Sequence, residues 1–152
     1  DELQAGAEDL AICSGACGGD LLFAEACLVR GVRVQLYLPF EEPEFLQKSV
    51  SFPQDGQKWR ARFAAVKANE KTSVLIMPDE LGEAPKGVNP FERVNMWQLF
   101  TALAFGAERL HFICLWNGDG GDGPGGTKHM LEEVKRNAGH VHVIDAKLLA
   151  GA

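Results

Sequence analysis

Two glycine-rich segments hold the residues best suited to chemistry in this chain. Residues 14–20 read Ser-Gly-Ala-Cys-Gly-Gly-Asp, and residues 117–127 read Asn-Gly-Asp-Gly-Gly-Asp-Gly-Pro-Gly-Gly-Thr. Each follows an apolar run and precedes a segment with helical periodicity. Glycine adopts positive φ and lets the backbone approach a ligand closely, and the first amides of a helix have no partner within it. Both segments therefore predict phosphate binding at a helix N-terminus.

Two such loops in one chain suggest that they hold opposite sides of a single ligand, with a phosphate at one loop and the remainder at the other. A binding site is thus indicated more clearly than a reaction. The first loop has the form G-x-x-G-G-D, which lacks the G-x-G-x-x-G spacing of dinucleotide-binding domains. No Gly-Lys-Ser/Thr follows it, so a P-loop is also disfavoured, and the sequence predicts no cofactor.

Composition limits the classes of partner. The chain has 152 residues, of which 46% are hydrophobic, and this length fits one compact domain. Its net charge of −6 and its scattered basic residues argue against nucleic-acid binding. No apolar run approaches the length of a membrane span, and the first residues, Asp-Glu-Leu, lack the basic start of a signal peptide. We therefore expect a cytoplasmic protein without a membrane partner.

The four cysteines are spread through predicted core elements and form no disulfide framework. No second ligand pair follows Cys13 and Cys17, and none of the four histidines stands at a metal-ligand offset from them. The sequence thus predicts buried thiols and no metal site. Cys17 is the exception, because a thiol near a helix N-terminus can have a lowered pKa.

The hydrophobic pattern alternates between strands and helices. Strands are predicted over residues 10–13, 32–38, 72–77, 110–116 and 141–144. Helices are predicted over residues 20–30, 44–49, 58–67, 90–105 and 127–137, and a loop over 79–89. This order predicts an α/β, Rossmann-like, doubly wound fold, with a mostly parallel sheet and helices on both faces. Residues 1–8 resemble the end of a helix with no strand before it, so we expect the domain to be a module of a longer protein.

Three segments together resemble a known superfamily. Residues 14–26, the run Arg93-Val94-Asn95-Met96 and the loop end Gly-Pro-Gly-Gly-Thr at 123–127 are similar to the SLOG superfamily of Rossmann-like domains. That superfamily joins the DprA proteins, the LOG phosphoribohydrolases and a set of nucleotide-sensor domains. The likeness spans residues 10–144 and is closest to the segment that follows a tetratricopeptide, TRAF-binding-like region in some bacterial multidomain proteins.

The resemblance implies a nucleotide or nucleotide-derived ligand at the carboxyl ends of the strands. Arg93 would supply a cation for phosphate, Asn95 would bridge ligand hydroxyls, and Thr127 would act as both helix N-cap and phosphate donor. With the two loops, the predicted ligand-binding residues are Ser14, Gly15, Gly18, Gly19, Asp20, Arg93, Asn95, Asn117, Gly118, Gly125, Gly126 and Thr127.

The chain departs from the LOG pattern at the residue that matters for catalysis. LOG enzymes carry a glutamate three residues after the threonine, whereas this chain has Met130 there, and the nearest acids are Glu132 and Glu133. Because each helical residue turns by about 100°, neither acid replaces position 130 without a shifted helix start. Binding survives this change more readily than hydrolysis does.

Three functions stay open. The first is a non-catalytic nucleotide sensor in signalling or defence, in contact with other domains of its parent protein or with a second copy of itself. The second is a LOG-like phosphoribohydrolase that cleaves the N-glycosidic bond of a nucleoside monophosphate, with Asp20, Glu132 or Glu133 as the catalytic acid. The third is a protein-interaction module without ligand that uses an exposed aromatic surface near Phe40, Phe45 and Phe52.

Overall fold

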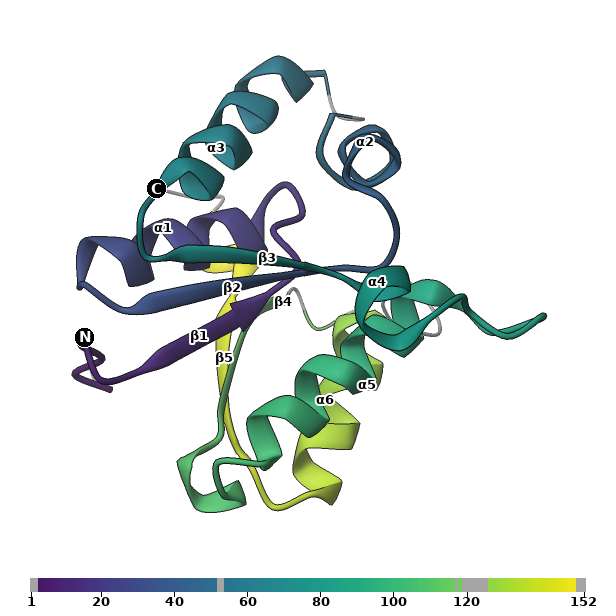
Figure 1. Cartoon of the computed structure of the whole chain (residues 1–152). Coiled ribbons are helices and arrows are strands. Elements are labelled where there is room, and N and C mark those ends of the chain that lie inside the picture. Colours follow the sequence, from purple (N-terminus) through teal and green to yellow (C-terminus); the bar gives the residue numbers. More distant parts are fainter. Residues whose placement is uncertain (1–2, 52–53, 117, 119–125, 150–152) are drawn as a thin grey trace. The chain divides into compact units, whose positions relative to one another are not determined.

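A computed structural model describes residues 3–51, 54–116, 118 and 126–149 (Figure 1). The chain divides into two compact units, Asp1–Ala84 and Pro85–Ala152, and each is described by itself. Both units are built from parallel strands and helices, so the mixed α/β class predicted from the sequence is confirmed. Among the described residues, no helix is long and apolar enough to cross a membrane.

The first unit is a three-stranded parallel sheet in the order β1-β2-β3. Its strands are β1 (Leu10–Cys13), β2 (Arg33–Leu38) and β3 (Thr72–Ile76). Leu36 of β2 lies opposite Cys13 on one side and Val74 on the other. The central strand, β2, is buried over most of its length.

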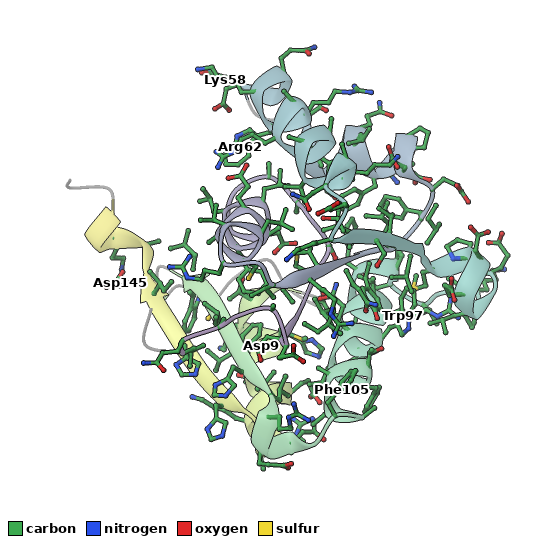
Figure 2. All side chains as sticks on the ribbon, turned by 60° about the vertical axis from the view of Figure 1, so that its left-hand side comes forward. Asp9, Lys58, Arg62, Trp97, Phe105 and Asp145 are labelled. Atoms are coloured by element: carbon green, nitrogen blue, oxygen red, sulfur yellow. The ribbon has the colours of Figure 1, made fainter. Side chains whose placement is uncertain are left out.

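Helices α1 (Gly19–Val29) and α3 (Gly56–Ala68) lie together on one face of this sheet (Figure 1). Residues that recur every third position bury the inner side of each helix, namely Leu21, Ala24 and Cys27 on α1 and Phe63 and Val66 on α3. On α3, Arg62 reaches toward α1, where its guanidinium donates two hydrogen bonds to the carboxylate of Glu25 (Figure 2).

Two short helical segments complete the first unit after β2 and β3. Helix α2 (Glu42–Phe45) continues into a π-helical turn over Leu46–Val50, close to the helix predicted at 44–49. Helix α4 (Met77–Leu81) occupies part of the predicted loop 79–89, and that prediction is wrong there. Pro78 ends the strand as expected, but its fixed φ also suits the first turn of a helix.

The N-terminal prediction is also wrong within the described residues. Residues 3–9 form turns and no helix. Gly6 donates its amide hydrogen to the Asp9 carboxylate at 2.8 Å, which closes a tight turn directly before β1. Aspartate favours such local turns because its short side chain competes for backbone amides.

The second unit contains a two-stranded parallel sheet of β4 (His111–Trp116) and β5 (His140–Asp145). Its helices are α5 (Pro90–Leu103), a 3₁₀ turn over Ala107–Arg109, α6 (Thr127–Arg136) and α7 (Ala146–Leu149). His140 donates its amide hydrogen to the Leu110 carbonyl at 2.9 Å, and the ladder then runs from His111 opposite His140 to Trp116 opposite Asp145. Helix α6 connects the two strands and so makes a βαβ crossover.

Candidate functional site

The carboxylate of Asp20 fills the centre of the loop that follows β1. Its Oδ2 atom accepts hydrogen bonds from three successive amides, those of Ser14 (3.2 Å), Gly15 (3.1 Å) and Ala16 (3.3 Å). Successive amides that converge on one point form the kind of concavity that binds anions. This part of the predicted phosphate cradle therefore holds an anion that the chain itself supplies.

Of the next four amides, the first holds the loop in place and the other three have no acceptor among the described residues. Cys17 donates to the Ser49 carbonyl at 2.9 Å, which attaches the loop to the π-helical turn. Within the described part of the chain, the next three amides, those of Gly18, Gly19 and Asp20, donate to no other residue. They are the first amides of α1, whose N-cap, Gly18, offers no side-chain acceptor. The unused donors thus lie at the helix end, four residues further along than the loop's first amide.

Two glycines of this loop have positive φ but differ in how closely other atoms surround them. Gly15 has φ +80°, and a Cβ there would also make tight contacts of 3.3 Å with the Leu36 and Phe63 side chains. Gly18 has φ +89°, but a Cβ there would meet no atom within 4 Å. At Gly18 the restriction is therefore conformational.

Burial raises the pKa values of two groups in this loop. It raises the pKa of Asp20, although the three amide hydrogen bonds favour the ionised form and oppose the shift. Partial burial also raises the pKa of Cys17, and the charges of Asp20 and Asp55 act in the same direction. The predicted lowering of the Cys17 pKa is therefore wrong, because burial and two nearby carboxylates outweigh the helix terminus.

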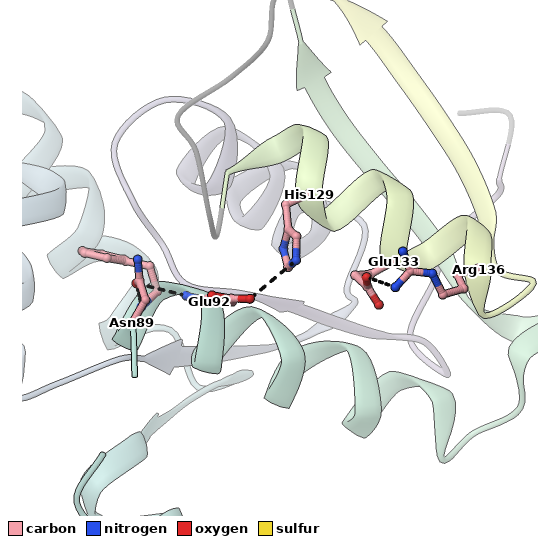
Figure 3. A network of polar contacts seen from close by, with 6 residues as sticks. Asn89, Glu92, His129, Glu133 and Arg136 are labelled. Atoms are coloured by element: carbon pink, nitrogen blue, oxygen red, sulfur yellow. Dashed lines mark hydrogen bonds and ion pairs between the residues drawn. The ribbon is translucent and has the colours of Figure 1, made fainter. Parts of the chain in front are cut away.

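The second unit places two other helix ends side by side (Figure 3). Glu92 in the first turn of α5 and His129 in the first turn of α6 form an ion pair at 3.7 Å when the imidazole is protonated. Arg93 and Asn95, the predicted phosphate and hydroxyl contacts, are half-buried in the first two turns of α5. Arg93 and Asn95 lie within one turn of Glu92 on α5, and Thr127 is the first residue of α6, two positions before His129.

The second glycine loop lies mostly outside the described residues, including Asn117 and Gly125. Gly118 is described and has φ +86°. Gly126, not Thr127, is the N-cap of α6, and no side chain caps the helix. The predicted capping role of Thr127 is wrong by one position, because the helix already includes that residue.

The two candidate catalytic acids of α6 differ in exposure, since the side chain of Glu133 is only 15% exposed. Glu132 is exposed, and Glu133 accepts a hydrogen bond from Arg136 one turn later (Figure 3).

Of the predicted aromatic surface, Phe45 is only 1% exposed and packs against Phe40 and Phe63 at centroid distances of 6.4 and 6.0 Å. Phe45 therefore belongs to the core, and Phe52 lies outside the described residues.

One surface hollow of about 310 Å³ lies between α2, the π-helical turn and α3. Its lining includes Phe63, Arg60 and Lys67 and none of the predicted site residues. Across the described residues, no group of three or more histidine, cysteine, aspartate or glutamate side chains is placed to hold a metal ion.

Sequence reasoning missed the inward turn of Asp20 and the attachment of Cys17 to Ser49. The first has a local signal, since an acid in the first turn after two glycines can reach back to the amides before them. The second joins residues that are far apart in the chain and has no sequence signal.

Comparison with protein-family models, with curated proteins and with solved structures found no match for this chain.

Proposed function

We propose that the chain binds a nucleotide or nucleotide-derived ligand through its phosphate and serves as a sensor module in signalling or defence. One observation carries the proposal: the three amides that begin α1, those of Gly18, Gly19 and Asp20, have no acceptor in the described part of the chain. Phosphate is the ligand that such a helix end favours, because free donors and the positive end of the helix dipole meet there.

The neighbouring Asp20 carboxylate both supports and limits this site. It fixes the preceding loop, so the helix end is held ready for a ligand and less conformational entropy is lost on binding. Its negative charge would repel phosphate if it stayed ionised. Burial raises the pKa of Asp20, and its Oδ2 atom faces the amides of the preceding loop.

Membership of the SLOG superfamily and a doubly wound, Rossmann-like arrangement stay predictions of the sequence. The β1–α1–β2 segment supports them, since it has parallel strands, a crossover helix and a glycine-rich first connection. Ligands of open α/β sheets bind at the carboxyl ends of strands, where this connection lies.

Isothermal titration calorimetry tests the proposal. The ligands are adenosine and guanosine mono- and diphosphates, cyclic nucleotides, a nucleotide sugar and ADP-ribose, with the parent nucleosides as phosphate-free controls. We expect at least one phosphate compound to bind about tenfold or more tightly than its nucleoside, which corresponds to about 1.4 kcal/mol from the phosphate contacts. Arg93→Ala tests the predicted phosphate contact of α5 in the same assay.

A matched pair of glycine variants locates the site. Gly18→Ala should weaken nucleotide binding, because the φ of +89° that aims the helix amides disfavours alanine. Gly82→Ala is the control, since Gly82 also has positive φ (+74°) and open space around it but lies after α4. Absence of binding by every compound, or equal effects of the two variants, would contradict the proposal. Release of free base in the same samples would favour the hydrolase alternative.

A further inference from the structure

Three of the four histidines gather on one side of the β4–β5 ladder. His111 opens β4 directly opposite His140, the first residue of β5. His142 stands two residues further along β5, and residues two apart in a strand project from the same face of a sheet. The parallel register therefore brings together three imidazoles from two strands.

The contacts among these rings are close. His111 stacks on His140 with a centroid distance of 4.8 Å and an interplanar angle of 18°, and on His142 at 5.3 Å and 29°. His111 Nδ1 and His142 Nε2 are 3.0 Å apart and share one hydrogen, whose donor depends on the tautomer. The outer ring, His140, is held at its Nε2 by the Glu108 carbonyl at 3.2 Å.

The 3.0 Å between His111 Nδ1 and His142 Nε2 also matches the distance between two imidazole ligands on one metal ion. Imidazole nitrogens bind zinc at about 2.0–2.1 Å, and two of them at tetrahedral or right angles on one ion lie about 3 Å apart. Imidazole suits Cu²⁺, Ni²⁺ and Zn²⁺ among the divalent metals. His111 and His140 are exposed and His142 is half-buried, so an ion can reach the pair from solvent.

We propose that His111 Nδ1 and His142 Nε2 form a two-nitrogen site for a divalent transition metal that links β4 to β5. Water fills the remaining coordination positions, since the described residues contain no group of three or more histidine, cysteine, aspartate or glutamate side chains placed to hold a metal ion. His140 acts as a positioning residue, because its ring stacks on His111 while its own nitrogen is engaged by Glu108.

Copper is the sharpest probe, since divalent first-row metals follow an affinity order that peaks at Cu²⁺. Titration of the full chain carrying Cys17→Ser, which removes the one free thiol that is not buried and that Cu²⁺ would oxidise, should give one equivalent of CuCl₂ bound, and electron paramagnetic resonance should show nitrogen coupling from two imidazoles. Binding should also raise the melting temperature, because the metal joins two strands and binds the folded ladder more tightly than the unfolded chain. Acidification should release the ion, since only unprotonated imidazole nitrogens are ligands.

Single substitutions distinguish this site from scattered binding by surface histidines. His111→Ala and His142→Ala should each weaken Cu²⁺ binding about 100-fold, and His140→Ala about tenfold, as expected for a supporting residue. His140→Phe should restore binding because phenylalanine keeps the stacked ring, and His129→Ala on α6 should leave binding unchanged.

His111→Asn is a second variant in case alanine unfolds the strand, and circular dichroism confirms folding for each protein. Loss of copper that is equal in His129→Ala and His142→Ala would overturn the proposal. So would the absence of bound copper in the wild-type chain, or a spectrum with one nitrogen ligand.

Discussion

The helices α1 and α5 begin in opposite ways. At α5 the side chain of Asn89 accepts hydrogen bonds from the amides of Phe91 at 2.9 Å and Glu92 at 3.3 Å, so the chain closes that helix end itself. At α1 the N-cap is Gly18, and the nearest polar side chain, that of Asp20, turns away to the loop before the helix. One helix uses its polar residue as a cap, and the other uses it to hold a loop.

This difference shows what a glycine-rich start does physically. Asparagine followed by Pro90 makes a self-sufficient helix end, because the side chain satisfies two amides and proline has none to satisfy. Glycine at the N-cap leaves the first amides open, and a carboxylate in the first turn becomes available for the preceding loop. Capacity for an external anion therefore depends on which amides the nearest polar side chain uses.

Removal of the Asp20 carboxylate should have the largest effect. Asp20→Ala leaves three partly buried amides without their acceptor, and we expect the free energy of unfolding to fall by about 3 kcal/mol. Asp20→Asn is the matched control, because its carbonyl oxygen can still accept from the loop. Urea denaturation followed by far-UV circular dichroism measures both. Equal losses for the two variants would show that the charge, and not the acceptor, holds the loop.

The same residue should also tune ligand affinity. If Asp20 sits beside bound phosphate, Asp20→Asn removes a negative charge and should tighten binding of the best nucleotide about tenfold, or about 1.4 kcal/mol. Glu25→Gln is the control, since Glu25 lies further along α1 and pairs with Arg62. Calorimetry at one pH and one salt concentration compares the three proteins. Weaker binding by Asp20→Asn alone would mean that Asp20 contacts the ligand as an acceptor.

The sequence predicted most of the elements around these helix ends and fewer of their contacts. Strand β1 has the predicted bounds of 10–13, and α1 is within one residue of its predicted bounds, because hydrophobic periodicity and Gly31 define them locally. The inward turn of Asp20 and the Cys17–Ser49 bond were missed. Periodicity describes which face of an element is buried, but not which of several acceptors a given amide selects.

At α5 the cap should contribute an ordinary amount. Asn89→Ala removes the acceptor for two exposed amides, and we expect a loss of about 1 kcal/mol in the free energy of unfolding. Asn89→Asp keeps a side-chain acceptor and should stay near the wild type. Urea denaturation again gives the comparison, and a loss as large as that of Asp20→Ala would remove the contrast between the two helix ends.

The smallest effect concerns how two carboxylates of α1 respond to pH. The hydrogen bonds from Arg62 lower the pKa of Glu25, whereas burial raises the pKa of Asp20. Glu25 therefore stabilises the fold above its unfolded pKa of about 4.3, and this contribution is lost as pH falls through the lower folded pKa. For Asp20 the sign is reversed: stability present below an unfolded pKa of about 3.9 is lost as pH rises through the folded pKa.

Urea denaturation from pH 3 to pH 7 separates the two effects. Glu25→Gln should cost about 0.5 kcal/mol at pH 7 and almost nothing at pH 3, because about a third of each side chain of the Glu25–Arg62 pair is exposed and solvent weakens the attraction. Asp20→Asn should gain stability relative to the wild type over the same rise in pH. Parallel curves for the two variants would mean that both carboxylates sit in similar surroundings, contrary to the arrangement in which one is enclosed by the loop and the other pairs with Arg62 between two helices.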